Sequence, residues 1–157
     1  MDIESEVWRV RYLQLAKQVS SYSKDTTTKT GAFIFDRDGL PVSFGYNGPP
    51  RGIDDTRDDI HVRPKKYFYY EHAERNAIYN ANGKVLKDSV IFCTHFPCAD
   101  CARGIIQKGI STVVVDEIHG PGKDSGYSKR WDDSMQASHD MLTSVGIKII
   151  ETKLGED

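Results

Sequence analysis

Two short motifs contain the residues best suited to chemistry: His-Ala-Glu at 72–74 and Pro-Cys-Ala-Asp-Cys at 97–101. An imidazole and two thiolates are ligands that zinc binds well. Cysteines three positions apart at the start of a helix present their sulfur atoms to the same side. Three protein ligands leave the fourth position of a tetrahedral ion open, which is typical of catalytic zinc. The spacing therefore predicts one zinc ion held by His72, Cys98 and Cys101, with hydrolysis as its chemistry.

Glu74 is the residue that a metal site of this kind does not need. Two thiolates offset the charge of the ion, so water at the site is acidified less than beside three imidazoles, and an adjacent base becomes useful. In a continuing helix Glu74 would point away from His72. We hypothesise that a helix begins here, so that both side chains reach one cavity and Glu74 is the catalytic acid and base.

Other interpretations of the same residues stay open at this point. An isolated Cys-x-x-Cys is also typical of a redox pair or of half of a structural zinc site. A structural site needs a fourth ligand, which His61 or His95 could supply. We expect His95 to line a pocket or to lie at the surface, and Cys93, within an apolar strand, to belong to the core.

Composition indicates one domain, residues 1–157, with enough length to bury a core. The net charge of −2 gives no general attraction to polyanions, so we expect no polynucleotide partner. Only three cysteines are present, and two of them belong to the zinc motif. We therefore expect no disulfide framework and a location in the reducing cytoplasm. The acidic start and the lack of a long apolar run predict neither export nor a membrane span.

The order of elements predicts an α/β fold. We expect a first helix whose buried stripe is Trp8, Tyr12, Leu15, Val19 and Tyr22. Strands are expected at 30–35, 41–46, 89–94, 112–115 and 147–151, helices at 68–82, 97–109 and 131–145, and a loop at 119–129. Helical crossovers make the last three strands parallel. The prediction is a three-layer α/β/α sandwich with a five-stranded mixed sheet.

The signature His-x-Glu followed by Pro-Cys-x-x-Cys is that of zinc deaminases, in which the Glu is acid and base and not a ligand. Three segments, 45–52, 71–78 and 96–102, closely resemble the deoxycytidylate (dCMP) deaminase family, within a similarity that runs from about 8 to 151. The resemblance implies a cytidine-deaminase-like fold, one zinc per subunit and conversion of dCMP to dUMP, the precursor of thymidylate. It also implies a homo-oligomer, often a hexamer, activated by dCTP and inhibited by dTTP with Mg²⁺.

The resemblance also implies substrate contacts. Asn47 matches the position whose amide holds the sugar hydroxyl, although Asn before Gly48 is also typical of a turn. The loop that follows His119 carries a net positive charge and several glycines, which suits a phosphate. Our phosphate candidates there are Tyr127, Lys129 and Arg130, although such loops are often only solvated surface.

An effector site, by the same resemblance, would use the 45–52 loop with groups of a neighbouring subunit; the candidates are Gly45, Tyr46, Gly48 and Arg51. The alternatives are a deaminase acting on dCTP, free cytidine, guanine or tRNA adenosine, or a non-catalytic zinc module. The net charge disfavours tRNA, the helical crossover before the last strand disfavours free cytidine, and Glu74 disfavours a purely structural site.

Overall fold

One mixed sheet forms the centre of the protein, whose computed structural model describes residues 2–155. The strand order is β2-β1-β3-β4-β5. β1 pairs antiparallel with β2 and β3, whereas β3, β4 and β5 are parallel. The strands are β1 (Gly31–Phe35), β2 (Pro41–Tyr46), β3 (Val90–Cys93), β4 (Thr112–Asp116) and β5 (Lys148–Thr152). The predicted mixed five-stranded sheet, with its last three strands parallel, is confirmed.

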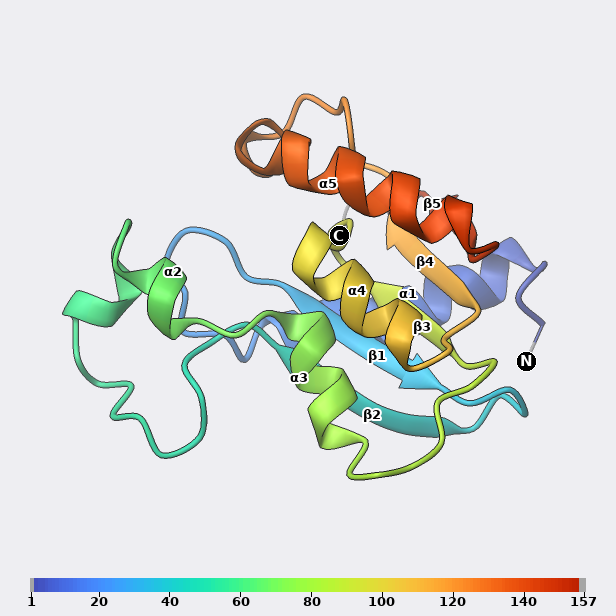
Figure 1. Cartoon of the computed structure of the whole chain (residues 1–157), viewed down its shortest axis with the longest axis horizontal. Coiled ribbons are helices and arrows are strands. Elements are labelled where there is room, and N and C mark those ends of the chain that lie inside the picture. The colour runs from blue at the N-terminus through green and yellow to red at the C-terminus, as the bar shows by residue number, and fades with distance from the viewer. Residues whose placement is uncertain (1, 156–157) are drawn as a thin grey trace.

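Helices cover both faces of the sheet (Figure 1). Residues such as Phe92 and Val114 alternate with Ile91 and Val113 along the strands, and both sets are buried, so each face needs a cover. α1 packs on the first set, and α3, α4 and α5 pack on the second. The helices are α1 (Glu6–Ser20), the short 3₁₀ helix η1 (Asp59–His61), α2 (Lys66–Tyr69), α3 (Ala73–Asn80), α4 (Ala99–Gln107) and α5 (Gly126–Ser144). The three-layer arrangement is therefore confirmed.

α3 lies unusually close to strand β2 because residue 45 is a glycine. A Cβ atom at Gly45 would lie 2.4 Å from the backbone nitrogen of Ala77 and 2.5 Å from the carbonyl oxygen of Ala73. Real Cβ atoms do not approach backbone atoms so closely, so no side chain fits. This contact places the first turn of α3 beside the sheet, where the zinc motif begins.

The predicted stripe of α1 is wrong at three of its positions. Trp8, Leu15 and Tyr22 are 42%, 42% and 52% exposed, whereas the buried residues are Leu13, Ala16, Val19 and Ser20. The helix approaches β1 most closely at Gly31, where a Cβ atom would lie 2.1 Å from the carbonyl oxygen of Ala16 and 2.7 Å from the backbone nitrogen of Ser20. Small residues of α1 therefore face the sheet at this point, and the four-three spacing of the larger side chains was misleading.

The helix predicted at 68–82 is two helices with a break between them. Tyr70 and His72 have extended backbone, with ψ angles of 129° and 154°. Glu71 is held in an antiparallel bridge with Gly48, whose two hydrogen bonds measure 3.1 and 2.8 Å. Backbone pairing over a long sequence separation therefore overrides the local preference for helix.

The loop predicted at 119–129 is also too long, because α5 already begins at Gly126. The side chain of Ser125 accepts a hydrogen bond of 3.0 Å from the backbone nitrogen of Ser128, which is the usual N-cap contact. Tyr127, Lys129 and Arg130 therefore stand on the first turns of a helix. Among residues 2–155, no helix is both long and apolar enough to cross a membrane.

Candidate active site

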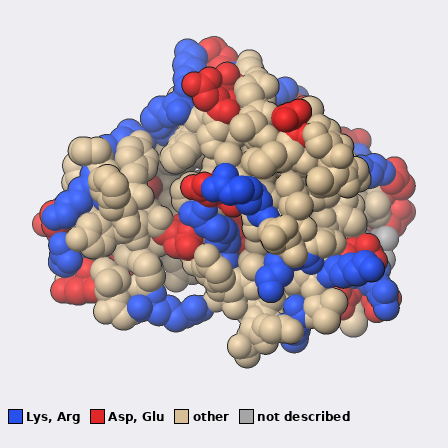
Figure 2. Space-filling model, in the orientation of Figure 1, with Lys and Arg blue, Asp and Glu red and all other residues tan. Residues whose placement is uncertain are grey.

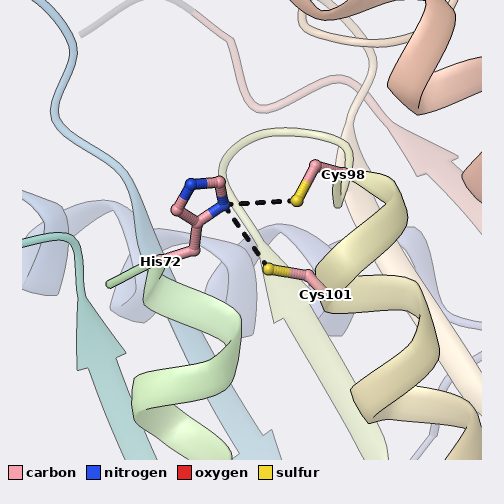
Figure 3. Close-up of side chains that lie close together, drawn as sticks. All are labelled: His72, Cys98 and Cys101. Atoms are coloured by element: carbon pink, nitrogen blue, oxygen red, sulfur yellow. Dashed lines mark hydrogen bonds between the residues drawn. The ribbon is translucent and has the colours of Figure 1, made fainter. Parts of the chain in front are cut away.

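The N-termini of α3 and α4 meet at a cluster of three side chains (Figure 3). His72 is the N-cap of α3, Cys98 is the N-cap of α4, and Cys101 lies in the first turn of α4. His72 Nδ1 lies 3.3 Å from Cys98 Sγ and 3.6 Å from Cys101 Sγ. The three donor atoms lie within 4.8 Å of one another. Residues that are 29 positions apart in the chain thus converge on one point.

The ring of His72 is held in place by its neighbours. The backbone nitrogen of His72 donates to the Glu71 carboxylate at 3.0 Å, and the same carboxylate accepts from Arg75 at 2.5 Å. The face of the imidazole is fixed by Trp131, whose ring stands at 89° to it with 5.5 Å between centroids. These contacts restrict the direction in which Nδ1 points.

The two cysteines differ in their affinity for a proton. The hydrogen bond from the Cys101 thiol, with that to His72, lowers the pKa of Cys98 to about 4 against the opposing effect of burial. Burial and the hydrogen bond to Cys98 raise the pKa of Cys101 well above its usual range. Burial alone would lower the pKa of His72, but the hydrogen bond and the charge of Cys98 raise it. The cluster therefore favours one thiolate and a shared proton, which a metal ion would displace.

The donor set fits zinc. One imidazole nitrogen and two sulfur atoms are the ligands of many catalytic zinc sites, and helix N-termini stabilise the thiolates. Within the part of the chain that the structure describes, the cluster contains these three donors and no fourth. His61 is engaged elsewhere, with Tyr70 and the Asp55 carbonyl, and His95 stacks on His119 with 4.1 Å between ring centroids.

Glu74 lies in the first turn of α3 and is 4% exposed. It lines the same pocket as His72. Burial is the largest influence on the pKa of Glu74 and raises it, the charge of His72 opposes this, and the charge of Cys98 adds to it. A carboxyl group with a raised pKa is suited to both accepting and donating protons near neutral pH.

The pocket beside this cluster has one aromatic wall. Tyr67, Tyr127 and Trp131 line it. The rings of Tyr67 and Trp131 meet at 86° with 5.9 Å between centroids, and those of Tyr127 and Trp131 at 33° with 6.3 Å. Flat apolar surfaces at this spacing are suited to a planar heterocyclic ring. The Tyr127 hydroxyl donates to the carbonyl of Phe96 at 3.3 Å.

Two guanidinium groups lie at the rim of the same pocket. Arg63 donates to the Thr27 hydroxyl at 3.3 Å, and Arg130 donates to the Thr28 hydroxyl at 3.0 Å. Two successive residues thus each contact an arginine that lines the pocket, and two guanidinium groups in one pocket are suited to a phosphate group. Sequence reasoning missed Arg63. Its only signal in the sequence is its position in residues 47–66, a segment too long for a plain connection, and long loops are often functional.

Comparison with known proteins decides the family. A family model described as the zinc-binding region of cytidine and deoxycytidylate deaminases matches residues 6–117. An uncharacterised deaminase of Aliivibrio fischeri is 39% identical over 142 residues, which cover 90% of this chain and 91% of that protein. This chain belongs to the cytidine and deoxycytidylate deaminase family. It is a hydrolytic deaminase, in agreement with the resemblance seen in the sequence.

Two further relatives of this deaminase have names that state a substrate. Human deoxycytidylate deaminase is 36% identical over 119 residues, covering 71% of this chain and 67% of that protein. A crystal structure of dCMP deaminase from the cyanophage S-TIM5, in complex with dCMP and dUMP, has a TM-score of 0.73 at 25% identity. The alignment covers 97% of this chain and 99% of the phage enzyme, so the predicted cytidine-deaminase-like fold is confirmed.

The structure brings three of the four substrate candidates of this deaminase together. Asn47, Tyr127 and Arg130 line the pocket, but Lys129 does not. The Lys129 side chain is 68% exposed and its ammonium pairs with Asp124 at 3.0 Å. Successive residues of a helix point in different directions, so Arg130 faces the pocket while Lys129 faces solvent. We therefore withdraw Lys129 as a phosphate candidate.

Three of the four effector candidates share a second groove. Tyr46, Gly48 and Arg51 line it together with residues of α3, among them Asn76 and Asn80. Gly45 does not line it, because α3 covers this residue. The explanation for Gly45 is packing of the helix on the strand, so its assignment as an effector contact is withdrawn.

The surface over α3 and α4 carries charges of both signs. In Figure 2 basic and acidic side chains lie against one another at the centre of the face. Arg75 contacts Glu71 at 2.5 Å and Asp100 at 3.6 Å, and Arg103 also pairs with Asp100. Charges that neutralise each other at this spacing give the face little attraction for a polyanion.

Proposed function

We propose that this deaminase converts dCMP and water to dUMP and ammonia, with one zinc ion in each subunit. One observation carries the proposal: the His72, Cys98 and Cys101 cluster and the buried Glu74 adjoin a pocket whose rim holds Arg63 and Arg130. The first set suits hydrolysis at a ring carbon, and the second suits a phosphate. The names of the human and phage relatives support dCMP as the substrate.

His72, Cys98 and Cys101 would hold the ion. Zinc with an open position supplies Lewis acidity, which lowers the pKa of water by several units. The proton chemistry belongs to Glu74, which accepts a proton from the attacking water and donates it to ring nitrogen N3. A bond forms between the water oxygen and C4. Glu74 then carries the remaining proton of that oxygen to the exocyclic amine, the C4–N4 bond breaks as the C4 carbonyl forms, and ammonia leaves.

The remaining pocket residues would orient the nucleotide. The aromatic wall of Tyr67, Tyr127 and Trp131 would flank the base, and Arg63 and Arg130 would bind the phosphate. Asn47 would contact the sugar hydroxyl. The mixed charge of Figure 2 supports a mononucleotide over a polynucleotide.

Regulation and assembly belong to the same proposal. The groove of Tyr46, Gly48 and Arg51 would bind dCTP as activator or dTTP with Mg²⁺ as inhibitor, in a homo-oligomer. Its Arg51 guanidinium and its Tyr46 and Tyr79 rings suit a nucleotide. The support for this part is the location of the three candidates in one groove.

An ultraviolet assay tests the proposal. dCMP, CMP, dCTP and deoxycytidine are each supplied to the zinc-loaded protein, with and without dCTP or dTTP plus Mg²⁺. We expect turnover of dCMP with ammonia release, and weaker turnover of the other three. No turnover of any monophosphate refutes the assignment, and preferred turnover of dCTP moves it to a triphosphate deaminase.

A further inference from the structure

An ion pair between Asp25 and Lys66 is buried in the wall of the active-site pocket. The ammonium nitrogen lies 3.0 Å from Asp25 Oδ2, and the two side chains are 3% and 6% exposed. Lys66 also donates to the Thr27 hydroxyl at 2.8 Å. A buried ion pair is weak evidence for stability, because the cost of removing two charges from water offsets their attraction. Its position in the pocket wall suggests a role toward the substrate.

Asp25 also contacts the side chain of Asn47. Asn47 Nδ2 donates to Asp25 Oδ2 at 3.4 Å and to the carbonyl of Thr28 at 3.0 Å. Asn47 Oδ1 accepts from the backbone nitrogen of Thr30 at 2.9 Å. Both acceptors and the one donor are chemically unambiguous, so the orientation of the amide is determined.

As a result, the Asn47 amide can form a further hydrogen bond only as an acceptor. A primary amide has two N–H donors and two acceptor lone pairs. Asp25 and Thr28 take both donors of Asn47, and Thr30 takes one lone pair. What remains is a lone pair on Oδ1, so a ligand at Asn47 must supply a hydrogen-bond donor.

We propose that Asp25 is a positioning residue that makes Asn47 an acceptor only, and thereby selects nucleotides with a free 3′-hydroxyl. The inference rests on the proposed function. The sugar of dCMP has a single hydroxyl, the 3′-OH, which can donate to Oδ1. A 3′-deoxy sugar and a 3′-linked phosphodiester have no O–H there, so the amide would discriminate against both, including the internal residues of a polynucleotide.

Lys66 offsets the charge of Asp25, whose burial without a counter-charge would be costly. Its ammonium is directed to both Asp25 oxygens and to the Thr27 hydroxyl, at 3.0, 3.3 and 2.8 Å. Its three N–H groups are thereby used, which leaves the phosphate to Arg63 and Arg130. Lys66 thus neutralises Asp25 without becoming a substrate ligand.

The wild-type protein provides the first test. Zinc-loaded enzyme is assayed with dCMP and with 2′,3′-dideoxycytidine 5′-monophosphate, which differs only at the 3′ position. We expect kcat/KM to be about tenfold or more lower for the dideoxy substrate, because one hydrogen bond to a buried acceptor is lost. No turnover of dCMP would refute the proposed function and this inference with it. Equal turnover of the two substrates would refute the inference alone.

A double variant provides the second test. Asp25→Leu with Lys66→Met removes both charges together and leaves neither unpaired. We expect KM for dCMP to rise about tenfold with kcat unchanged, KM for the dideoxy substrate to stay constant, and the preference between the two to fall by the same factor. A loss that is merely structural would affect both substrates equally, and this result would overturn the inference.

A matched control removes an exposed ion pair between the neighbour of Asp25 in the sequence and a residue of the 47–66 segment, which contains Lys66. Lys24 and Asp55 pair at 2.8 Å with side chains that are 56% and 44% exposed. Lys24→Met with Asp55→Asn should leave the preference for dCMP over the dideoxy substrate at its wild-type value. If this control also loses the preference for dCMP, the preference does not depend specifically on the buried ion pair, and the role of Asp25 is overturned.

Discussion

His72 and Glu74 line one pocket although they are two residues apart in the chain. The reason is that α3 begins between them. His72 is the N-cap, with extended backbone, and Glu74 is the second residue of the helix. In a continuous helix their side chains would diverge by about 200°. The break at Glu71, which Gly48 holds through backbone pairing, therefore creates the site.

Glu74→Gln should retain the fold and the metal and lose activity. Glutamine has the shape of a protonated glutamate but cannot accept and return protons. We expect kcat to fall about 10²- to 10⁴-fold, with zinc content and melting temperature close to those of the wild type. The measurements are ammonia release, metal analysis by mass spectrometry and thermal unfolding.

The matched control for this variant is Glu6→Gln. Glu6 also occupies the first turn of a helix, α1, but is exposed and does not line the pocket. Its activity should equal that of the wild type. A Glu74→Gln enzyme that retains wild-type kcat would remove Glu74 from the mechanism.

The three cysteines should behave differently toward metal. Cys98→Ser and Cys101→Ser each remove one member of the cluster, whereas Cys93 lies in β3, fully buried in the core. We expect one zinc per subunit in the wild type and in Cys93→Ala, and less than half of that in the other two. Metal analysis after dialysis against a chelator is the measurement. Because bound zinc stabilises the folded state, the two ligand variants should also melt at lower temperature. Full zinc content in Cys101→Ser would contradict the ligand assignment.

Substitution by alanine should change the stability of the protein at one glycine of the 45–52 segment and not at another. In Gly45→Ala the new Cβ would meet backbone atoms of α3, at 2.4 and 2.5 Å, so the helix must move. Overpacking of this kind costs about 1–3 kcal/mol or more of the free energy of unfolding. Gly48→Ala meets nothing within 4 Å and should change stability little. Urea unfolding measures both. Since α3 carries His72 and Glu74, Gly45→Ala should also lower kcat, and an active, stable Gly45→Ala would refute the packing role.

The features that could be predicted from the sequence are those encoded by neighbouring residues. β-branched and apolar runs predicted the strands, and the zinc ligands were found because their chemistry is contained in two short motifs. Asp25, Lys66 and Arg63 were not found. The Asp25–Lys66 contact spans 41 positions, and no local spacing marks it. The break before α3 was missed for the same reason, because pairing with Gly48 produces it.

The stability contribution of the buried ion pair should depend on pH. The pKa of Asp25 is lowered: burial acts to raise it, but hydrogen bonds from Thr27 and Lys66 and the charge of Lys66 outweigh burial. A carboxylate whose pKa is lower in the folded state stabilises that state above its unfolded pKa of about 3.9. This contribution is lost as the pH falls through the folded value. Asp25→Asn leaves Lys66 buried without a counter-charge, which should cost about 3 kcal/mol or more at pH 7.

The difference in unfolding free energy between wild type and Asp25→Asn should therefore persist at pH 7 and pH 5 and shrink at about pH 3, which is below the pKa of about 3.9 at which Asp25 of the unfolded wild type takes up a proton. Urea unfolding at the three pH values measures it. Loss of metal in acid affects both proteins equally, because they share the same zinc ligands. Asp55→Asn, which breaks the exposed pair with Lys24, should change stability by less than about 1 kcal/mol throughout. A difference for Asp25→Asn that stays constant down to pH 3 would show that charge on Asp25 does not stabilise the pocket wall.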